Sequence, residues 1–132
     1  MSYQYHDISK MIDHALLVPT LTAKELEEGC QLAMEFDVAS VCIMPYYLAR
    51  CTEILAGTTV MPSTTIGFPH GGQATPTKLA EAQQAIEDGC QELDMVVNIS
   101  QVRSAAWDDV QAEIGQLVDL AHSADRKVKV IF

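Results

Sequence analysis

The chain has 132 residues, of which 48% are hydrophobic, and its 18 acidic and 8 basic residues give a net charge of −10. This length allows one compact domain with its own core. The acidic excess argues against nucleic acid and anionic membranes as partners, because both bind basic surfaces. No apolar run approaches the roughly 20 residues that span a bilayer, and the N-terminus lacks a signal pattern, so we expect a cytoplasmic protein.

The cysteine spacing argues against a metal centre. The chain contains four cysteines: Cys30, Cys42, Cys51 and Cys90. None belongs to a CxxC pair, and all lie within apolar periodic segments. We therefore expect reduced, buried thiols, with neither a disulfide framework nor a zinc site.

The first half of the chain predicts helices and a strand, after a short N-terminal helix. Thr22 and Glu25 have the spacing of a capping box and begin a helix over residues 22–36. The apolar, β-branched segment 38–44 predicts a strand. Proline then opens a helix over residues 45–57, which ends at a glycine.

The second half repeats this alternation. The predicted elements are a strand over 63–68, a helix capped by Thr75 and ending at Gly89, a strand over 92–99, a turn-rich passage through Ser104, a helix over 107–121 and a strand over 127–132. The predicted strands start about 25 to 35 residues apart, which is the period of β–α–β crossover units. Near-continuous apolar strands of this kind form parallel sheets covered on both faces.

Two α/β architectures fit the alternation, namely an open doubly wound sheet and part of a closed barrel. A dinucleotide-binding sheet should carry GxGxxG after its first strand. The turn at that place is IMPYYL, without glycine, and GFPHGG matches neither that motif nor a phosphate-binding loop. The sequence therefore disfavours nucleotide binding. The final segment, KVKVIF, is an apolar strand with nothing to cover it, so we expect either a fragment or a covering partner chain.

Asp94 is the main candidate for chemistry. Strand alternation in ELDMVVNI places Asp94 and Asn98 on one face, and a barrel interior suits a carboxylate better than the helix-facing layer. A buried carboxylate is costly unless it is paired. A lysine opposite would keep it ionised and able to transfer protons, whereas the alternative is a purely structural pair or cap. Lys127 and Lys129 share one face of the last strand and could meet a carboxylate there, or could simply be solvated.

Three further candidates have ordinary structural alternatives. Cys42 could be a nucleophile, but no basic neighbour is evident, and packing of a buried thiol is the favoured interpretation. Asp13 and His14 could form a small polar pair. His70 lies in the FPHGG loop and could bind substrate, although a turn residue is the simpler interpretation.

Five segments together resemble the deoxyribose-phosphate aldolases: MIDHALLVPTLT, VCIMPYYL, TTIGFPHG, ELDMVVNIS and KVKVIF. The resemblance covers about residues 11–132, and IGFPHG and LDMVVNI are its most specific parts. It implies a (β/α)8 TIM barrel that cleaves 2-deoxy-D-ribose 5-phosphate to D-glyceraldehyde 3-phosphate and acetaldehyde. That family uses a lysine Schiff base as electron sink and needs no metal or other cofactor.

The same resemblance assigns roles to single residues. Asp94 matches an aspartate on the third strand that relays protons. Asp13 and Cys42 match positions that line the pocket, and Asn98 is a further substrate-binding candidate. Ser100 stands where many relatives have glycine, a difference that we expect to matter little.

The resemblance extends only to the N-terminal half of the barrel. It implies a single (β/α)4 half-barrel over residues 1–132, with about four parallel strands, covering helices and a short N-terminal helical extension. The Schiff-base lysine and its activating lysine belong to strands six and seven, so we expect the lysine partner of Asp94 to lie outside this chain. We accordingly expect a sugar phosphate as ligand but no activity of the chain alone.

Open strand edges and an uncovered concave face predict a homodimer. The alternative function is a non-catalytic, self-associating half-barrel module in which Asp94 is a remnant.

Overall fold

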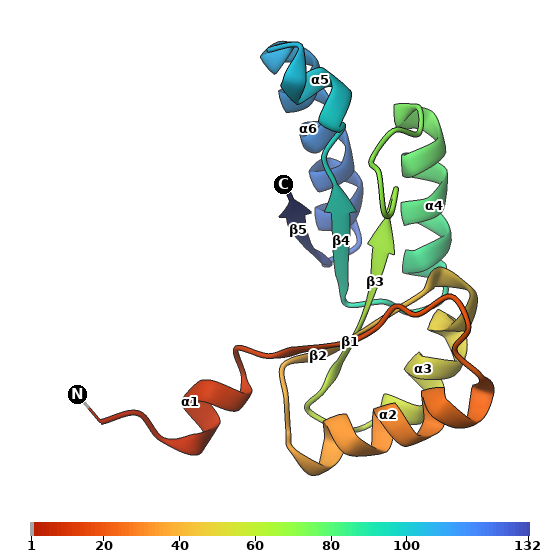
Figure 1. Ribbon diagram of the computed structural model, residues 1–132, viewed down its shortest axis with the longest axis vertical. Coiled ribbons are helices and arrows are strands. Elements are labelled where there is room, and N and C mark those ends of the chain that lie inside the picture. The colour runs from red at the N-terminus through yellow and green to blue at the C-terminus, as the bar shows by residue number, and fades with distance from the viewer. Residues whose placement is uncertain (1) are drawn as a thin grey trace.

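The computed structural model describes residues 2–132, which form one parallel sheet with helices (Figure 1). The five strands follow one another in chain order: β1 (Asp13–Leu16), β2 (Ser40–Ile43), β3 (Met61–Ile66), β4 (Glu92–Val96) and β5 (Lys127–Ile131). The helices are α1 (Tyr5–Ser9), α2 (Ala23–Glu35), the 3₁₀ helix η1 (Pro45–Tyr47), α3 (Leu48–Leu55), α4 (Thr75–Glu87), α5 (Ile99–Arg103) and α6 (Trp107–Ser123). Among the described helices, none is long and apolar enough to cross a membrane.

The predicted helix starts are largely present. Thr22 accepts a hydrogen bond from the backbone N–H of Glu25, and the Glu25 carboxylate accepts one from the backbone of Thr22, as a capping box requires. Pro45 opens η1, which continues into α3. Helix α4 begins one residue earlier than predicted, because Ala74 and not Thr75 is its N-cap.

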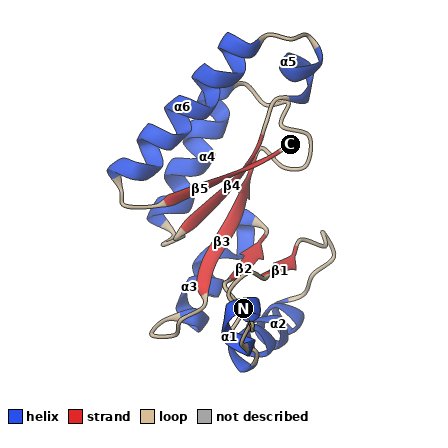
Figure 2. Ribbon diagram, turned by 90° about the vertical axis from the view of Figure 1, so that its left-hand side faces the viewer, coloured by secondary structure: helices blue, strands red, loops and turns tan. Residues whose placement is uncertain are grey.

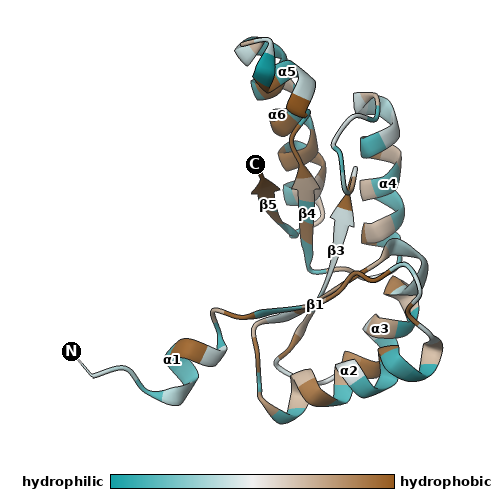
Figure 3. Ribbon diagram, in the orientation of Figure 1, coloured by the Kyte–Doolittle hydropathy of each residue, from teal (hydrophilic) through white to brown (hydrophobic). Residues whose placement is uncertain are grey.

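The two faces of the sheet differ in polarity. The helix-facing side of the strands holds the apolar core, which includes Val41, Ile43, Ile66, Leu93 and Met95. Figure 2 shows α4 and α6 along this side of β3, β4 and β5. Hydrophobic and hydrophilic residues alternate along the helices that cover it (Figure 3), so each helix has one apolar side to bury. The opposite, concave face carries the polar residues described below.

The sequence predicted about four strands, but the structure has five, because β1 was not recognised. Its four residues are only half-buried and exposed in alternation, so they lack a continuous apolar run. The ladder to β2 defines it instead, with Asp13 opposite Ser40. Asp94 therefore lies on the fourth strand and not the third, and the chain reaches a fifth strand.

Two other boundaries differ from the prediction. Strand β4 ends at Val96, before the predicted end at residue 99, because Asn98 caps a following helix. That helix, α5, occupies most of the passage that was predicted to be turn-rich.

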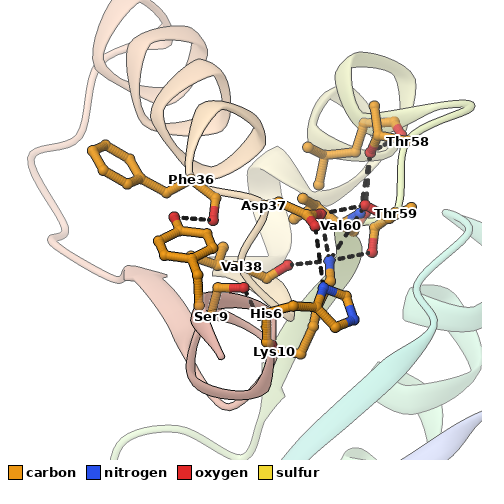
Figure 4. Close-up of polar contacts among 11 residues, drawn as sticks. His6, Ser9, Lys10, Phe36, Asp37, Val38, Thr58, Thr59 and Val60 are labelled. Atoms are coloured by element: carbon orange, nitrogen blue, oxygen red, sulfur yellow. Dashed lines mark hydrogen bonds and ion pairs between the residues drawn. The ribbon is translucent and has the colours of Figure 1, made fainter. Parts of the chain in front are cut away.

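A lysine joins the N-terminal helix to the amino-terminal ends of the strands (Figure 4). Lys10 Nζ donates hydrogen bonds to Asp37 Oδ1 at 2.6 Å, to the Val38 carbonyl at 3.0 Å and to the Thr59 carbonyl at 3.2 Å. Asp37 and Val38 lie in the segment between α2 and β2, and Thr59 lies just before β3. This network therefore fixes the end of α1 to the amino-terminal ends of β2 and β3.

Candidate functional site

The candidate site lies on the concave face, where the strand register brings polar side chains into rows. Asp94 on β4 is paired in register with Thr65 on β3 and with Lys129 on β5. It faces the concave side, as the alternation predicted, and is 7% exposed. The row before it contains Cys42, Ser63 and Glu92 on consecutive strands.

Lys129 lies at the centre of the polar cluster. Its Nζ is 2.6 Å from Asp13 Oδ2, 3.2 Å from Glu92 Oε2 and 3.2 Å from Asp94 Oδ1. Asp13 belongs to β1 and Lys129 to β5, the two edge strands, so the sheet curls enough for its edges to meet across the concave face. The prediction that Asp94 has no lysine partner within the chain was wrong for its ion pair, because the parallel register sets Lys129 directly beside it. The position of the Schiff-base lysine outside the chain stays a prediction.

The surrounding carboxylates keep Lys129 protonated. Burial alone would lower the pKa of Lys129, but the hydrogen bond to Asp13 and the charge of Asp94 outweigh burial and raise it. An amine held in this state is a poor nucleophile, because only the neutral form attacks a carbonyl. Conversely, the Lys129 and Ser40 hydrogen bonds outweigh burial at Asp13 and lower the pKa of that carboxyl.

Asp94 has the opposite balance. Burial raises the pKa of Asp94, and the charge of the nearby Lys129 offsets only part of this effect. Although Lys129 Nζ is at ion-pair distance, Asp94 Oδ1 accepts no hydrogen bond of good geometry from any described residue. Asp94 therefore combines a raised pKa with an oxygen that accepts no hydrogen bond from the described residues, a combination that suits a proton-transfer group.

Cys42 lies on β2 in the same cluster, but its thiol is not activated. Burial and the negative charge of Asp94 raise its pKa to about 12, so the thiolate is scarce at neutral pH. The interpretation of Cys42 as a packing thiol is thus favoured over a nucleophile. All four cysteines are buried and free.

Two hydroxyls beside Asp94 were not singled out from the sequence. Ser63 and Thr65 on β3 are buried, and their oxygens have no hydrogen-bond partner among the described residues. They point to the concave face together with Asp94. Their spacing of two residues in STTIGF was a usable signal, since alternate residues of a strand share a face.

Other predicted residues lie around this cluster or away from it. Asn98 does not extend β4; its Oδ1 accepts hydrogen bonds from the backbone N–H groups of Ser100 and Gln101 and caps α5. The predicted Asp13–His14 pair is absent, because neighbouring strand residues point to opposite faces and Asp13 accepts instead from Ser40 at 2.6 Å. His70 is exposed in the loop after β3.

Comparison with known proteins matches the sequence of this chain to one family. A model of the DeoC/LacD family aldolases matches residues 8–131. The chain belongs to this family. A deoxyribose-phosphate aldolase from Rhodopirellula baltica is 65% identical over 98% of this chain, and one from Caldanaerobacter subterraneus is 44% identical over 95%.

A solved structure confirms the fold within this family. The tetrameric deoxyribose-phosphate aldolase from Aeropyrum pernix superposes with a TM-score of 0.85 at 29% identity, over 96% of this chain and 53% of that one. The chain likewise spans 54% of the length of each of the two relatives above. The predicted half-barrel is thus confirmed.

Proposed function

We propose that this chain supplies the first part of a deoxyribose-phosphate aldolase site, in which Asp94 relays protons. The observation that carries the proposal is the environment of Asp94: the carboxyl is buried on the concave face, its pKa is raised by burial, and its Oδ1 is 3.2 Å from Lys129 Nζ. The reaction is the reversible cleavage of 2-deoxy-D-ribose 5-phosphate to D-glyceraldehyde 3-phosphate and acetaldehyde.

The geometry suits the proton transfers of Schiff-base chemistry. Attack of a neutral lysine on an aldehyde gives a carbinolamine, which must gain a proton on its oxygen to lose water and form the iminium. Asp94 is suited to give and recover that proton, because it is a carboxyl on the concave face whose pKa burial raises. Lys129 stabilises the carboxylate that remains, and Asp13 in turn keeps Lys129 charged.

We further propose that the Schiff-base lysine lies outside these 132 residues and that the chain alone is inactive. Lys129 is the lysine nearest to Asp94, yet its carboxylate neighbours disfavour the neutral amine. Borohydride reduction in the presence of acetaldehyde, read by peptide mass spectrometry, should label no lysine above the level of Lys127, whose side chain is 69% exposed. Selective labelling of Lys129 would overturn this assignment.

Complementation tests the positive part of the proposal. The chain would be mixed with the remaining, carboxyl-terminal part of the R. baltica relative, and cleavage of 2-deoxyribose 5-phosphate would be followed. We expect activity from the mixture and a loss of about 10²- to 10⁴-fold with Asp94→Asn, the usual contribution of a proton-transfer group. Full activity of the Asp94→Asn mixture would contradict the role of Asp94.

A second candidate function, a self-associating half-barrel without catalysis, is favoured by one observation. The carboxyl end of β5 exposes apolar side chains, with Ile131 39% and Phe132 89% exposed. An uncovered edge strand of this kind pairs readily with another chain. A homodimer that binds no sugar phosphate in equilibrium dialysis would favour this function over the first.

A further inference from the structure

A second lysine, Lys78 on α4, is completely buried behind the sheet. Its exposed fraction is 0%, and its Nζ donates hydrogen bonds to Glu113 Oε2 at 2.8 Å and to the Val96 carbonyl at 2.9 Å. Glu113, on α6, is 2% exposed and also accepts a hydrogen bond from Thr75 Oγ1 at 3.1 Å. The pair therefore joins two helices to the last residue of β4.

Stability alone does not account for such a pair. Removing two charges from water is costly, and well-packed apolar residues are often equally or more stabilising in the same place. The pair fixes the geometry of this region, because the Lys78 ammonium holds its two acceptors, the Glu113 carboxylate and the Val96 carbonyl, at defined positions. One of these acceptors is the backbone of the strand that carries Asp94, two residues before Val96.

The loop after β3 lies against the same lysine. A Cβ on Gly67 would come within 2.8 Å of Lys78 Cε, and the Gly67 N–H donates to Glu81 Oε2 at 2.7 Å. Further along the loop, a Cβ on Gly71 would overlap the carbonyl oxygen of Val97. The loop thus contacts both the aliphatic side chain of Lys78 and the backbone at the end of β4. Lys78 therefore supports the loop and the end of the strand together.

We propose that Lys78, with Glu113, is a positioning residue that holds the loop of residues 67–72 and the end of β4 as one unit at the carboxyl rim of the site. In parallel α/β sheets, ligands bind at this rim. The inference deepens the proposed function, since it assigns to Lys78 the placement of the rim beside Asp94. Lys78 itself touches no reacting atom, because it lies on the helix-facing side.

The Lys10 network in Figure 4 is a matched control at the other end of the strands. Lys10 also binds one carboxylate, on Asp37, and backbone carbonyls. It does so at the amino-terminal ends of β2 and β3, away from the rim. Lys10 is partly buried, with a side chain that is 24% exposed. A general effect of losing a lysine that binds a carboxylate and backbone carbonyls should appear with both lysines, whereas an effect on the rim should appear with Lys78 alone.

Hydrogen exchange of the full chain tests the proposal. We expect Lys78→Met to increase amide exchange about tenfold or more in residues 67–73 and 96–99, because the substitution removes the hydrogen-bond donor to the Val96 carbonyl together with a tertiary contact. Lys10→Met should instead affect the segments around residues 37 and 59 and leave the rim unchanged. Equal acceleration over the whole chain with Lys78→Met would indicate global destabilisation and overturn the positioning role.

A gentler variant keeps the test informative if Lys78→Met fails to fold. Glu113→Gln retains a side chain that can accept from Lys78 while removing the charge, and should produce the same local exchange pattern at smaller amplitude. The apolar double variant Lys78→Met with Glu113→Leu should fold stably and still show the rapidly exchanging rim. A protected rim in this double variant would contradict the proposal.

A spectroscopic measurement connects the rim to the site. The carboxyl ¹³C titration of Asp94 should shift in Lys78→Met and remain as in the unmodified chain in Lys10→Met. Because it needs no activity, this result is independent of the aldolase assays. Faster exchange in residues 67–73 and 96–99 with an unchanged Asp94 titration would refute the role of Lys78 in positioning the site. If these residues exchange as expected but the complementation mixture is inactive, only the aldolase proposal is refuted.

Discussion

Asp94 is placed where its charge is unfavourable, and this predicts an unusual effect of its removal. Burial raises its pKa, so the folded chain binds the proton more tightly than the unfolded chain does. Its contribution to stability therefore improves as pH falls through the folded pKa and is least favourable at neutral pH. We expect Asp94→Asn to raise the free energy of unfolding at neutral pH by about 1 kcal/mol, because it removes a buried charge that is kept for function at a cost in stability.

Urea denaturation at several pH values measures this effect. The gain of Asp94→Asn over the unmodified chain should shrink as the pH is lowered toward the usual pKa of an aspartate, because the native carboxyl then becomes neutral as well. A loss of stability at neutral pH would mean that the Lys129 contact outweighs burial.

Asp13 should behave in the opposite way. Hydrogen bonds from Lys129 and Ser40 outweigh burial and lower its pKa, so its contribution is present above the ordinary aspartate pKa and is lost as pH falls through the folded value. We expect Asp13→Asn to lower the free energy of unfolding at neutral pH by about 1 kcal/mol, a modest value because the side chain is 40% exposed. The difference should vanish in acid, and a difference that persists there would contradict the ionic origin.

For single residues of the site, strand alternation predicted which face of the sheet a side chain points to, and no more. Alternation correctly placed Asp94 toward the interior and offered Lys129 as a possible partner. It could not decide the pairing, since register depends on which strands are neighbours. Asp13 remained unconnected to Lys129 because their contact spans 116 residues and uses a strand that the sequence did not indicate.

Among the elements, a clear apolar pattern separates those that the sequence predicted from those that it did not. Helices α2 and α6, with 13 and 17 residues, have enough turns for apolar periodicity to stand out. Strand β1 and helix α5 are short and lack a continuous apolar run, whereas the equally short β2 has four buried residues in succession. Tertiary contacts decide their conformation: a ladder for β1 and an asparagine cap for α5.

The loop between β3 and α4 offers a prediction at the same scale. Gly71 has φ +62°, and a Cβ there would overlap the Val97 carbonyl, so Gly71→Ala meets both backbone strain and a clash. We expect it to lower the free energy of unfolding by about 2–4 kcal/mol, measured by urea denaturation. Gly72→Ala is the matched control, because a Cβ at Gly72 has open space. Equal effects of the two substitutions would contradict this account.

For the whole molecule, the curled sheet predicts self-association. Strand β5 is an edge strand, and its concave-facing Ile131 is 39% exposed beside the terminal Phe132. Apolar surface at an open edge favours a second chain, and we expect a homodimer in sedimentation velocity experiments. Because each copy carries a net charge of −10, the dissociation constant should fall as salt screens their repulsion.

Substitution at the edge tests which surface the dimer uses. Ile131→Lys places a charge on the edge strand and should weaken the dimer by about tenfold or more, since burying an unpaired charge at an interface is costly. Trp107→Lys is the matched control: Trp107 is 59% exposed at the first residue of α6, on the helical layer and not on the edge strand, and its replacement should leave the dissociation constant unchanged. A folded monomer at all concentrations would refute the dimer, whereas dissociation by Trp107→Lys alone would move the interface from the β5 edge to the helical surface.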